Sequence, residues 1–117
     1  MIGYVTTHVL DTSLGSPAEG VKVELFIIEN KSKQLVNSII TNKDGRSDFH
    51  ILDRESFKLG VYEMQFDVRM YFDNLSENKL RNNFFDIIPI RFLVREDTHY
   101  HIPLLLSPFG YSTYRGS

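Results

Sequence analysis

A two-residue alternation of apolar and polar side chains, repeated in short runs, is the feature that most constrains how this chain can fold. Val21, Val23 and Leu25 are separated by single charged residues, and comparable runs recur along the sequence. Because successive side chains of a β-strand point to opposite faces, the pattern predicts strands with one buried and one wet face. Turn residues interrupt the runs roughly every 8 to 12 positions, which is typical of an all-β sandwich.

Strand character covers most of the chain, whose 117 residues fit a single domain over residues 1–117. We predict about seven or eight short strands in two packed sheets. Pro89 indicates an edge strand or a strand start, because proline cannot donate a backbone hydrogen bond to a neighbouring strand. The segments with strand character are residues 2–11, 21–29, 35–41, 61–72, 84–97 and 98–114.

One short helix is expected in the polar segment at residues 73–83, which contains no proline or glycine. Asp73 or Ser76 can act as its N-cap, because a short polar side chain accepts hydrogen bonds from the first free N–H groups of a helix. The sequence therefore predicts a mainly β fold with a single helical interruption.

Composition argues against several classes of function. Cysteine is absent, which removes disulfides, thiolate metal sites and cysteine nucleophiles. The formal charge is -2 and the 13 Lys and Arg residues are scattered, so nucleic acid is not an expected partner. No stretch reaches the roughly 18 apolar residues of a membrane helix, so a membrane is not expected as a partner either.

The expected location is cytoplasmic. Met1 leads directly into a strand-like segment rather than into a basic and then apolar leader. Residues 114–117 do not form the peroxisomal tripeptide of small, basic and leucine residues. A mature chain would not reveal a periplasmic or peroxisomal leader that had already been removed.

Four histidines, His8, His50, His99 and His101, are the first candidates for chemistry. His99 and His101 point to the same face if their strand is regular, and two such imidazoles can bind one metal ion. Without cysteine, that metal site would need His8 or an acidic residue as a third ligand. The alternative is that these two histidines are simply partly buried strand residues, and both interpretations stay open at this point.

Single residues elsewhere allow a functional or a structural interpretation. The Asp44–Gly45 pair favours a tight turn with positive φ, and Arg46 follows it directly. Taken alone, Arg46 is an ordinary solvated turn residue and His8 an ordinary strand residue. Neither position is assigned to a site by composition or periodicity.

The C-terminus is unusual because chain ends are commonly frayed and polar. Here Tyr111, Tyr114 and Arg115 come after the strongly apolar segment at residues 103–110. This arrangement predicts that the C-terminus is docked at a site or at an interface.

Three segments closely resemble the signature segments of the 5-hydroxyisourate hydrolases, which belong to the transthyretin-like family. They are TTHVLDTSLGSPAEGVKVEL at residues 6–25, TNKDGR at residues 41–46 and HYHIPLLLSPFGYSTYRGS at residues 99–117. The order is the expected one, so the resemblance covers the whole chain. In that family YRGS or a near variant separates the enzymes from the hormone-carrying transthyretins, and the implied fold is a transthyretin-like two-sheet sandwich.

The resemblance implies a site for hydrolysing 5-hydroxyisourate to 2-oxo-4-hydroxy-4-carboxy-5-ureidoimidazoline. Two histidines would orient and deprotonate water, with the identity of the base left open, while an arginine would stabilise the oxyanion. The family's C-terminal residues would bind the substrate and shape the pocket, with Arg115 anchoring the tail. The implied catalytic residues are His8, Arg46 and His101, and the implied substrate-binding residues are His8, Arg46, Tyr114, Arg115 and Ser117.

The resemblance further implies that neither a metal nor another cofactor is needed, and that four copies assemble. In this homotetramer, edge-paired dimers would pack around a channel with the sites at the dimer–dimer interface. Two alternatives remain: a transthyretin-like protein that binds small molecules without hydrolysis, and a metal-dependent hydrolase that uses His8, His99 and His101. The role of His99 stays open, and His50 matches no motif and is given no catalytic role.

Overall fold

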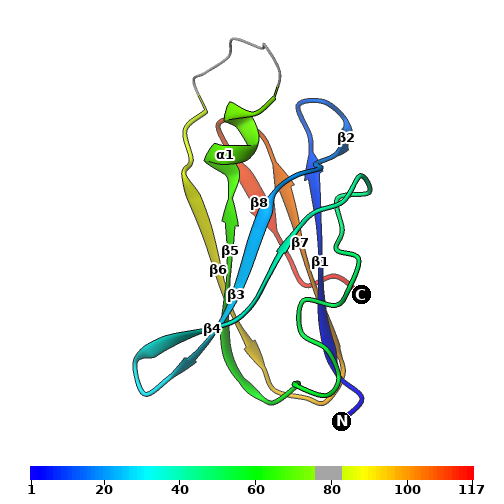
Figure 1. The fold of residues 1–117 in the computed structure, drawn as a ribbon, viewed down its shortest axis with the longest axis vertical. Helices are drawn as coiled ribbons and strands as arrows, with labels where there is room; N and C mark the ends of the chain where they lie inside the picture. Colours follow the sequence, from blue (N-terminus) through cyan, green and yellow to red (C-terminus); the bar gives the residue numbers. More distant parts are fainter. Residues whose placement is uncertain (76–82) are drawn as a thin grey trace.

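Two four-stranded sheets pack face to face in the computed structural model, which describes residues 1–75 and 83–117 (Figure 1). One sheet has the strand order β2-β1-β7-β8 and the other β4-β3-β5-β6. The predicted all-β sandwich is therefore confirmed. The strands are β1 (Tyr4–Asp11), β2 (Ser16–Pro17), β3 (Lys22–Glu29), β4 (Ser32–Ile40), β5 (Gly60–Asp67), β6 (Ile87–Val94), β7 (His99–Leu106) and β8 (Tyr111–Thr113).

The core lies between the sheets and is built from the alternation seen in the sequence. In β3, Val23, Leu25 and Ile27 are buried while the intervening residues reach the surface. Burying one such side chain fully contributes about 1.5 to 3 kcal/mol. A shift of one residue in register would turn these side chains outward, so the core holds the register of the strands.

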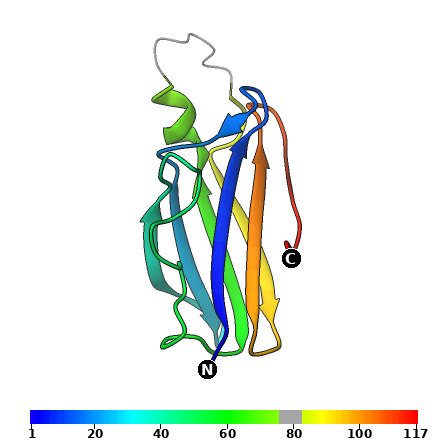
Figure 2. The same ribbon diagram turned by 90° about the vertical axis from the view of Figure 1, so that its right-hand side faces the viewer.

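The two ends of the chain meet in one sheet. Strands β1 and β7 pair in parallel, with Tyr4 opposite His99 and Thr6 opposite His101. Figure 2 shows the two strands side by side. Paired residues in a sheet point to the same face, and Val5 is buried, so these four side chains lie on the outer face of the sheet.

The described helix begins earlier in the chain than the segment predicted for it. Helix α1 spans Val68–Asp73, so β5 ends at Asp67 rather than running on to Phe72. Asp67 caps the helix by accepting a hydrogen bond of 3.1 Å from the Met70 N–H. The expected cap Asp73 is instead the last helical residue, and the rest of the predicted helix at 76–82, including Ser76, lies outside the described residues.

Burial explains why the chain turns helical here. Val68, Tyr71 and Phe72 are the buried residues of α1, and their spacing of three and four places them on one face of a helix. In a strand, Tyr71 and Phe72 would point to opposite faces. The helix lies at one end of the sandwich, opposite the N-terminus (Figure 1).

Local predictions about Pro89 and Gly45 are confirmed. Pro89 lies in β6, which is an edge strand of its sheet. Gly45 has a φ of 75°, and a Cβ at this position would lie 2.4 Å from the Val9 carbonyl oxygen. Only glycine allows the loop to approach β1 so closely.

The C-terminus is docked, as predicted. Strand β8 pairs with β7, and beyond it the Gly116 N–H donates a hydrogen bond of 2.8 Å to the His101 carbonyl. Figure 2 shows the last residues following β7 back along the sheet. Of the residues that the structure describes, none forms a helix long and apolar enough to cross a membrane.

Candidate active site

A polar pocket of about 470 Å³ lies on the outer face of the sheet that contains β1 and β7. Its walls come from segments that are far apart in the sequence: the two strands, the loop after Gly45 and the last residue of the chain. The lining residues are Tyr4, Thr6, Thr7, Arg46, Ser47, Asp48, His50, His99, His101 and Ser117.

Thr6 connects the two histidines of β7. Its Oγ1 lies 2.6 Å from His99 Nε2 and 2.8 Å from His101 Nδ1. Both contacts have hydrogen-bond distances, and both follow from the parallel register that places Thr6 opposite His101. A hydroxyl carries one proton, so it can donate to only one of the two rings.

Arg46 reaches the pocket because its loop is attached to β1. The Val9 N–H donates to the Gly45 carbonyl at 2.8 Å, and within the turn the Arg46 N–H donates to Asn42 Oδ1 at 3.2 Å. The same contact brings the loop against His8, since a Cβ at Gly45 would lie 3.3 Å from His8 Cδ2. His8 is therefore beside Arg46, although it does not line the pocket itself.

Three aromatic rings stack along one wall. Tyr4 lies between His99 and His50, with ring centroids 4.1 Å and 4.2 Å away and interplanar angles of 8° and 19°. The Arg54 guanidinium lies 5.0 Å from the centre of the Tyr4 ring. His50 thus belongs to the pocket wall, which its position in the sequence did not indicate.

The site favours neutral histidines. Burial lowers the pKa of His101, and the charges of Arg46, His99 and His8 lower it further. Burial also lowers the pKa of His8, as does Arg46, while a hydrogen bond to the Asp44 backbone acts in the opposite direction. A neutral imidazole can accept a proton, so the pocket can supply a base near neutral pH.

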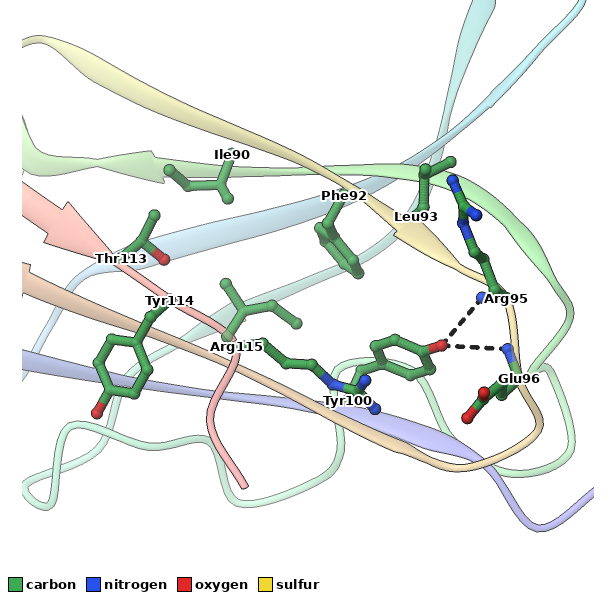
Figure 3. Close-up of a pocket in the computed structure, with 10 residues that line it drawn as sticks. Ile90, Phe92, Leu93, Arg95, Glu96, Tyr100, Thr113, Tyr114 and Arg115 are labelled. Carbon is green, nitrogen blue, oxygen red and sulfur yellow. Dashed lines mark hydrogen bonds between the residues drawn. The ribbon is translucent and has the colours of Figure 1, made fainter.

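The C-terminal residues divide between two sites. Ser117 lines the histidine pocket, but Tyr114 and Arg115 line a separate groove of about 310 Å³ between the open edges of the two sheets (Figure 3). The Arg115 guanidinium lies over the Tyr100 ring, 4.2 Å from its centre. Arg115 therefore holds the tail in place rather than facing the pocket of its own chain.

Gly116 lets the tail pass over His101. A Cβ at Gly116 would lie 2.5 Å from His101 Cδ2, closer than real Cβ atoms approach another atom. The His101 ring is thus held between the tail and Thr6. Any larger residue at Gly116 would displace the ring or the tail.

The histidines do not form a preassembled metal centre with acidic residues. Within residues 1–75 and 83–117, no group of three or more His, Cys, Asp or Glu side chains is placed to hold a metal ion. The Thr6 hydroxyl lies between His99 and His101 instead. That hydrolysis needs no metal stays a prediction.

Comparison with known protein families assigns the sequence to one of them. Residues 5–116 match the family described as HIUase/Transthyretin. The chain belongs to this family. A relative from Halalkalibacterium halodurans named 5-hydroxyisourate hydrolase is 48% identical over 100% of both chains.

Solved structures of the HIUase/Transthyretin family share the fold. The Klebsiella pneumoniae 5-hydroxyisourate hydrolase superposes with a TM-score of 0.81 at 32% identity, covering 97% of this chain and 99% of that one. Sea bream transthyretin in complex with thyroxine superposes with a TM-score of 0.86 at 24% identity, covering 96% of this chain and 93% of that one. The second likeness shows the fold alone.

In this member of the HIUase/Transthyretin family, the structure brings together Arg46, His101 and Ser117, with His8 beside them. His99, whose role the sequence leaves open, also lines the pocket, and the sequence motifs assign no role to its other lining residues. Tyr4 and Thr6 share the outer face of β1 with His8, so the alternation of β1 was an available signal for them. No comparable signal exists for the loop residues, which are Ser47, Asp48 and His50.

Proposed function

We propose that this chain is a hydrolase that converts 5-hydroxyisourate to 2-oxo-4-hydroxy-4-carboxy-5-ureidoimidazoline. The observation that carries the proposal is the convergence of Arg46, His101 and Ser117 in one polar pocket from three distant segments. Relatives at 45% and 48% identity over nearly their whole length are named 5-hydroxyisourate hydrolase. Family membership and the pocket therefore support the same reaction.

Hydrolysis of a ring amide requires a base for water and a positive group for the developing oxyanion. His101 lines the pocket in a setting that favours its neutral form, and Arg46 lines the same pocket. The attacking water gives its proton to a histidine while the carbonyl electrons move to the oxygen that Arg46 stabilises. When the ring C–N bond breaks, the histidine returns the proton to the leaving nitrogen.

The remaining proposed site residues have supporting roles. His8 lies beside Arg46 and helps to orient the water and the guanidinium. Ser117 binds the substrate from the end of the tail. Arg115 anchors that tail on Tyr100, and Tyr114, which is largely exposed, is available for substrate bound at an interface.

We also propose a homotetramer with the sites at the dimer–dimer interface. Strands β6 and β8 are open edges of the two sheets, and an apolar groove between them is lined by Ile90 and Phe92 (Figure 3). Open edges with apolar neighbours are commonly covered by a partner. Sedimentation should give four times the mass of one chain, and Leu93→Glu at the exposed edge of β6 should lower that mass.

The reaction is tested by following 5-hydroxyisourate decay by ultraviolet absorbance, with the substrate generated in situ by urate oxidase. We expect decay faster than the spontaneous reaction, and the same acceleration in the presence of a chelator. Loss of acceleration on chelation would favour the metal-dependent alternative with His8, His99 and His101.

A non-catalytic binding protein is the second candidate, because sea bream transthyretin shares the fold. A folded sample that leaves the decay rate at the spontaneous value would favour this candidate and reject the hydrolase. Circular dichroism of the same sample shows whether it is folded.

A further inference from the structure

Thr6 and His99 lie beside the proposed base, and the reaction as described above gives neither of them a role. Thr6 Oγ1 contacts the imidazole rings of both His99 and His101, and within His101 the nitrogen that it contacts is Nδ1. Among the described residues, His101 Nε2 has no hydrogen-bond partner, so it is the nitrogen available to a water molecule in the pocket. The protonation state of Nδ1 therefore decides whether Nε2 can accept a proton.

The single hydroxyl proton of Thr6 links the two rings. If Thr6 donates to His101 Nδ1, the neutral His101 ring carries its proton on Nε2 and cannot act as a base there. If Thr6 donates to His99 Nε2, its oxygen accepts the proton on His101 Nδ1, and His101 Nε2 is free. No third hydrogen-bond partner of Thr6 Oγ1 is present in the described part of the chain. These are therefore the two arrangements in which the Thr6 hydroxyl, His99 Nε2 and His101 Nδ1 are all hydrogen-bonded.

We propose that Thr6 and His99 are positioning residues that hold His101 in the tautomer with its proton on Nδ1. Neutral His99 accepts the Thr6 proton at Nε2, Thr6 accepts the Nδ1 proton of His101, and His101 Nε2 is left to accept the proton of the attacking water. This assignment rests on the proposed hydrolase function and makes His101, rather than His8, the general base.

The geometry around His99 supports this role. Tyr4, on the same strand as Thr6, stacks on the His99 ring at 4.1 Å and 8°, which fixes the ring plane. A protonated His99 would donate at Nε2, turn the Thr6 proton toward His101 and block the base. The neutral form of His99 is therefore required.

The charges around His99 oppose that protonation. Burial lowers the pKa of His99, and the charges of His50 and Arg115 lower it further. His50 lies on the loop across Tyr4, and Arg115 lies on the tail. The other titratable ring near His99 is that of His101, 6.0 Å away between ring centres on β7 itself. As hydrolysis proceeds, His101 becomes an imidazolium whose Nδ1–H bond to Thr6 is charge-assisted and stronger.

The direct test reads the tautomer without any substrate. Long-range proton–nitrogen spectra of protein labelled with ¹⁵N-histidine distinguish a proton on Nδ1 from one on Nε2, and single histidine substitutions assign the signals. We expect the Nδ1 proton on His101 in the wild type and in Thr6→Ser, and the Nε2 proton in Thr6→Val. His101 protonated at Nε2 in the wild type would overturn the proposal, whether or not the protein hydrolyses 5-hydroxyisourate.

Kinetics supply the second test. Thr6→Val keeps the β-branched shape but removes the hydroxyl, so kcat should fall on the order of 100-fold, the lower limit for a positioned base, with little change in KM. Thr6→Ser keeps the hydroxyl and should stay within roughly threefold of the wild type on the same scale. Equal rates for Thr6→Val and Thr6→Ser would exclude the relay.

A matched pair at His99 adds a pH readout that a purely structural role would not change. His99→Gln keeps an acceptor that does not titrate, whereas His99→Phe keeps the stacking on Tyr4 but has no acceptor. We expect His99→Phe to lose kcat as Thr6→Val does. In His99→Gln, the number of protons that titrate on the acid side of the kcat/KM pH profile should fall by one. An unchanged acid side would contradict the role of His99.

Discussion

The outer faces of the two sheets carry different kinds of polar cluster. On the sheet with β1 and β7, Thr6, His99 and His101 line an open pocket. On the other sheet, Glu63 of β5 accepts hydrogen bonds from Lys33 and Arg91, both with closest distances of 3.0 Å. One cluster retains unused hydrogen-bonding capacity, while the other is paired on both sides.

The difference shows that a perturbed pKa does not by itself identify a functional site. Hydrogen bonds from Gln65, Lys33 and Arg91 outweigh burial and lower the pKa of Glu63 to about 2. Glu63 has only 7% of its side chain exposed, and its partners Arg91 and Lys33 come from the adjacent strand β6 and from β4, which lies on the far side of β3. Its charge is satisfied, so Glu63 stabilises the sheet and has nothing left to offer a substrate.

The largest effect on activity, with little effect on stability, is expected from His101→Asn. Removing the proposed base should lower kcat on the order of 100-fold or more, because that is the usual contribution of a positioned general base. The melting temperature should change little, since His101 is only partly buried. The 5-hydroxyisourate assay and thermal unfolding measure the two quantities, and full activity in His101→Asn would remove this residue from the mechanism.

The opposite result is expected from Glu63→Gln. Losing the charge of a buried, doubly paired carboxylate should lower the free energy of unfolding by about 2 kcal/mol, with kcat unchanged. Urea denaturation measures the loss. The matched control is Glu29→Gln, whose exposed pair with Lys58 should contribute less than about 1 kcal/mol. Equal losses in free energy of unfolding for Glu63→Gln and Glu29→Gln would show that the buried ion pairs of Glu63 contribute no more than the exposed pair of Glu29.

The smallest effects should appear in the pH profiles. Because burial and Arg46 lower the pKa of His101, activity should persist below pH 6.5, the ordinary pKa of histidine, and fall only at lower pH. The lowered histidine pKa values also make the free energy of unfolding decline as pH falls below 6.5, since the unfolded chain then binds more protons. A fall in kcat/KM centred above 6.5 would contradict this assignment.

Glu63 affects the free energy of unfolding in a lower pH range than the histidines do. Its stabilising effect is complete above the ordinary glutamate value of 4.5 and is lost as pH falls toward about 2. The stability difference between the wild type and Glu63→Gln should therefore shrink from pH 4.5 to 2, as followed by circular dichroism during urea unfolding. A difference that stays constant over this range would show that Glu63 acts through packing rather than charge.

Much of this fold could be predicted from local sequence. The alternation in β3 depends only on residues two apart, and the Asp44–Gly45 turn depends only on neighbours, so both predictions hold in the structure. The helix at Val68–Asp73 was expected to be part of a strand because Val68, Tyr71 and Phe72 suit either a strand or a helix when read alone. Packing of these three side chains on one face decided between the two.

The same distinction between local sequence and tertiary packing applies to the residues of the site. The motifs identify Arg46, His101 and Ser117 as candidates, because a resemblance to known segments is a property of the sequence itself. That Thr6 lies between His99 and His101 depends on parallel pairing of β1 with β7, two strands at opposite ends of the chain. No local pattern encodes that pairing, because it is settled by which faces must be buried together when the two sheets pack.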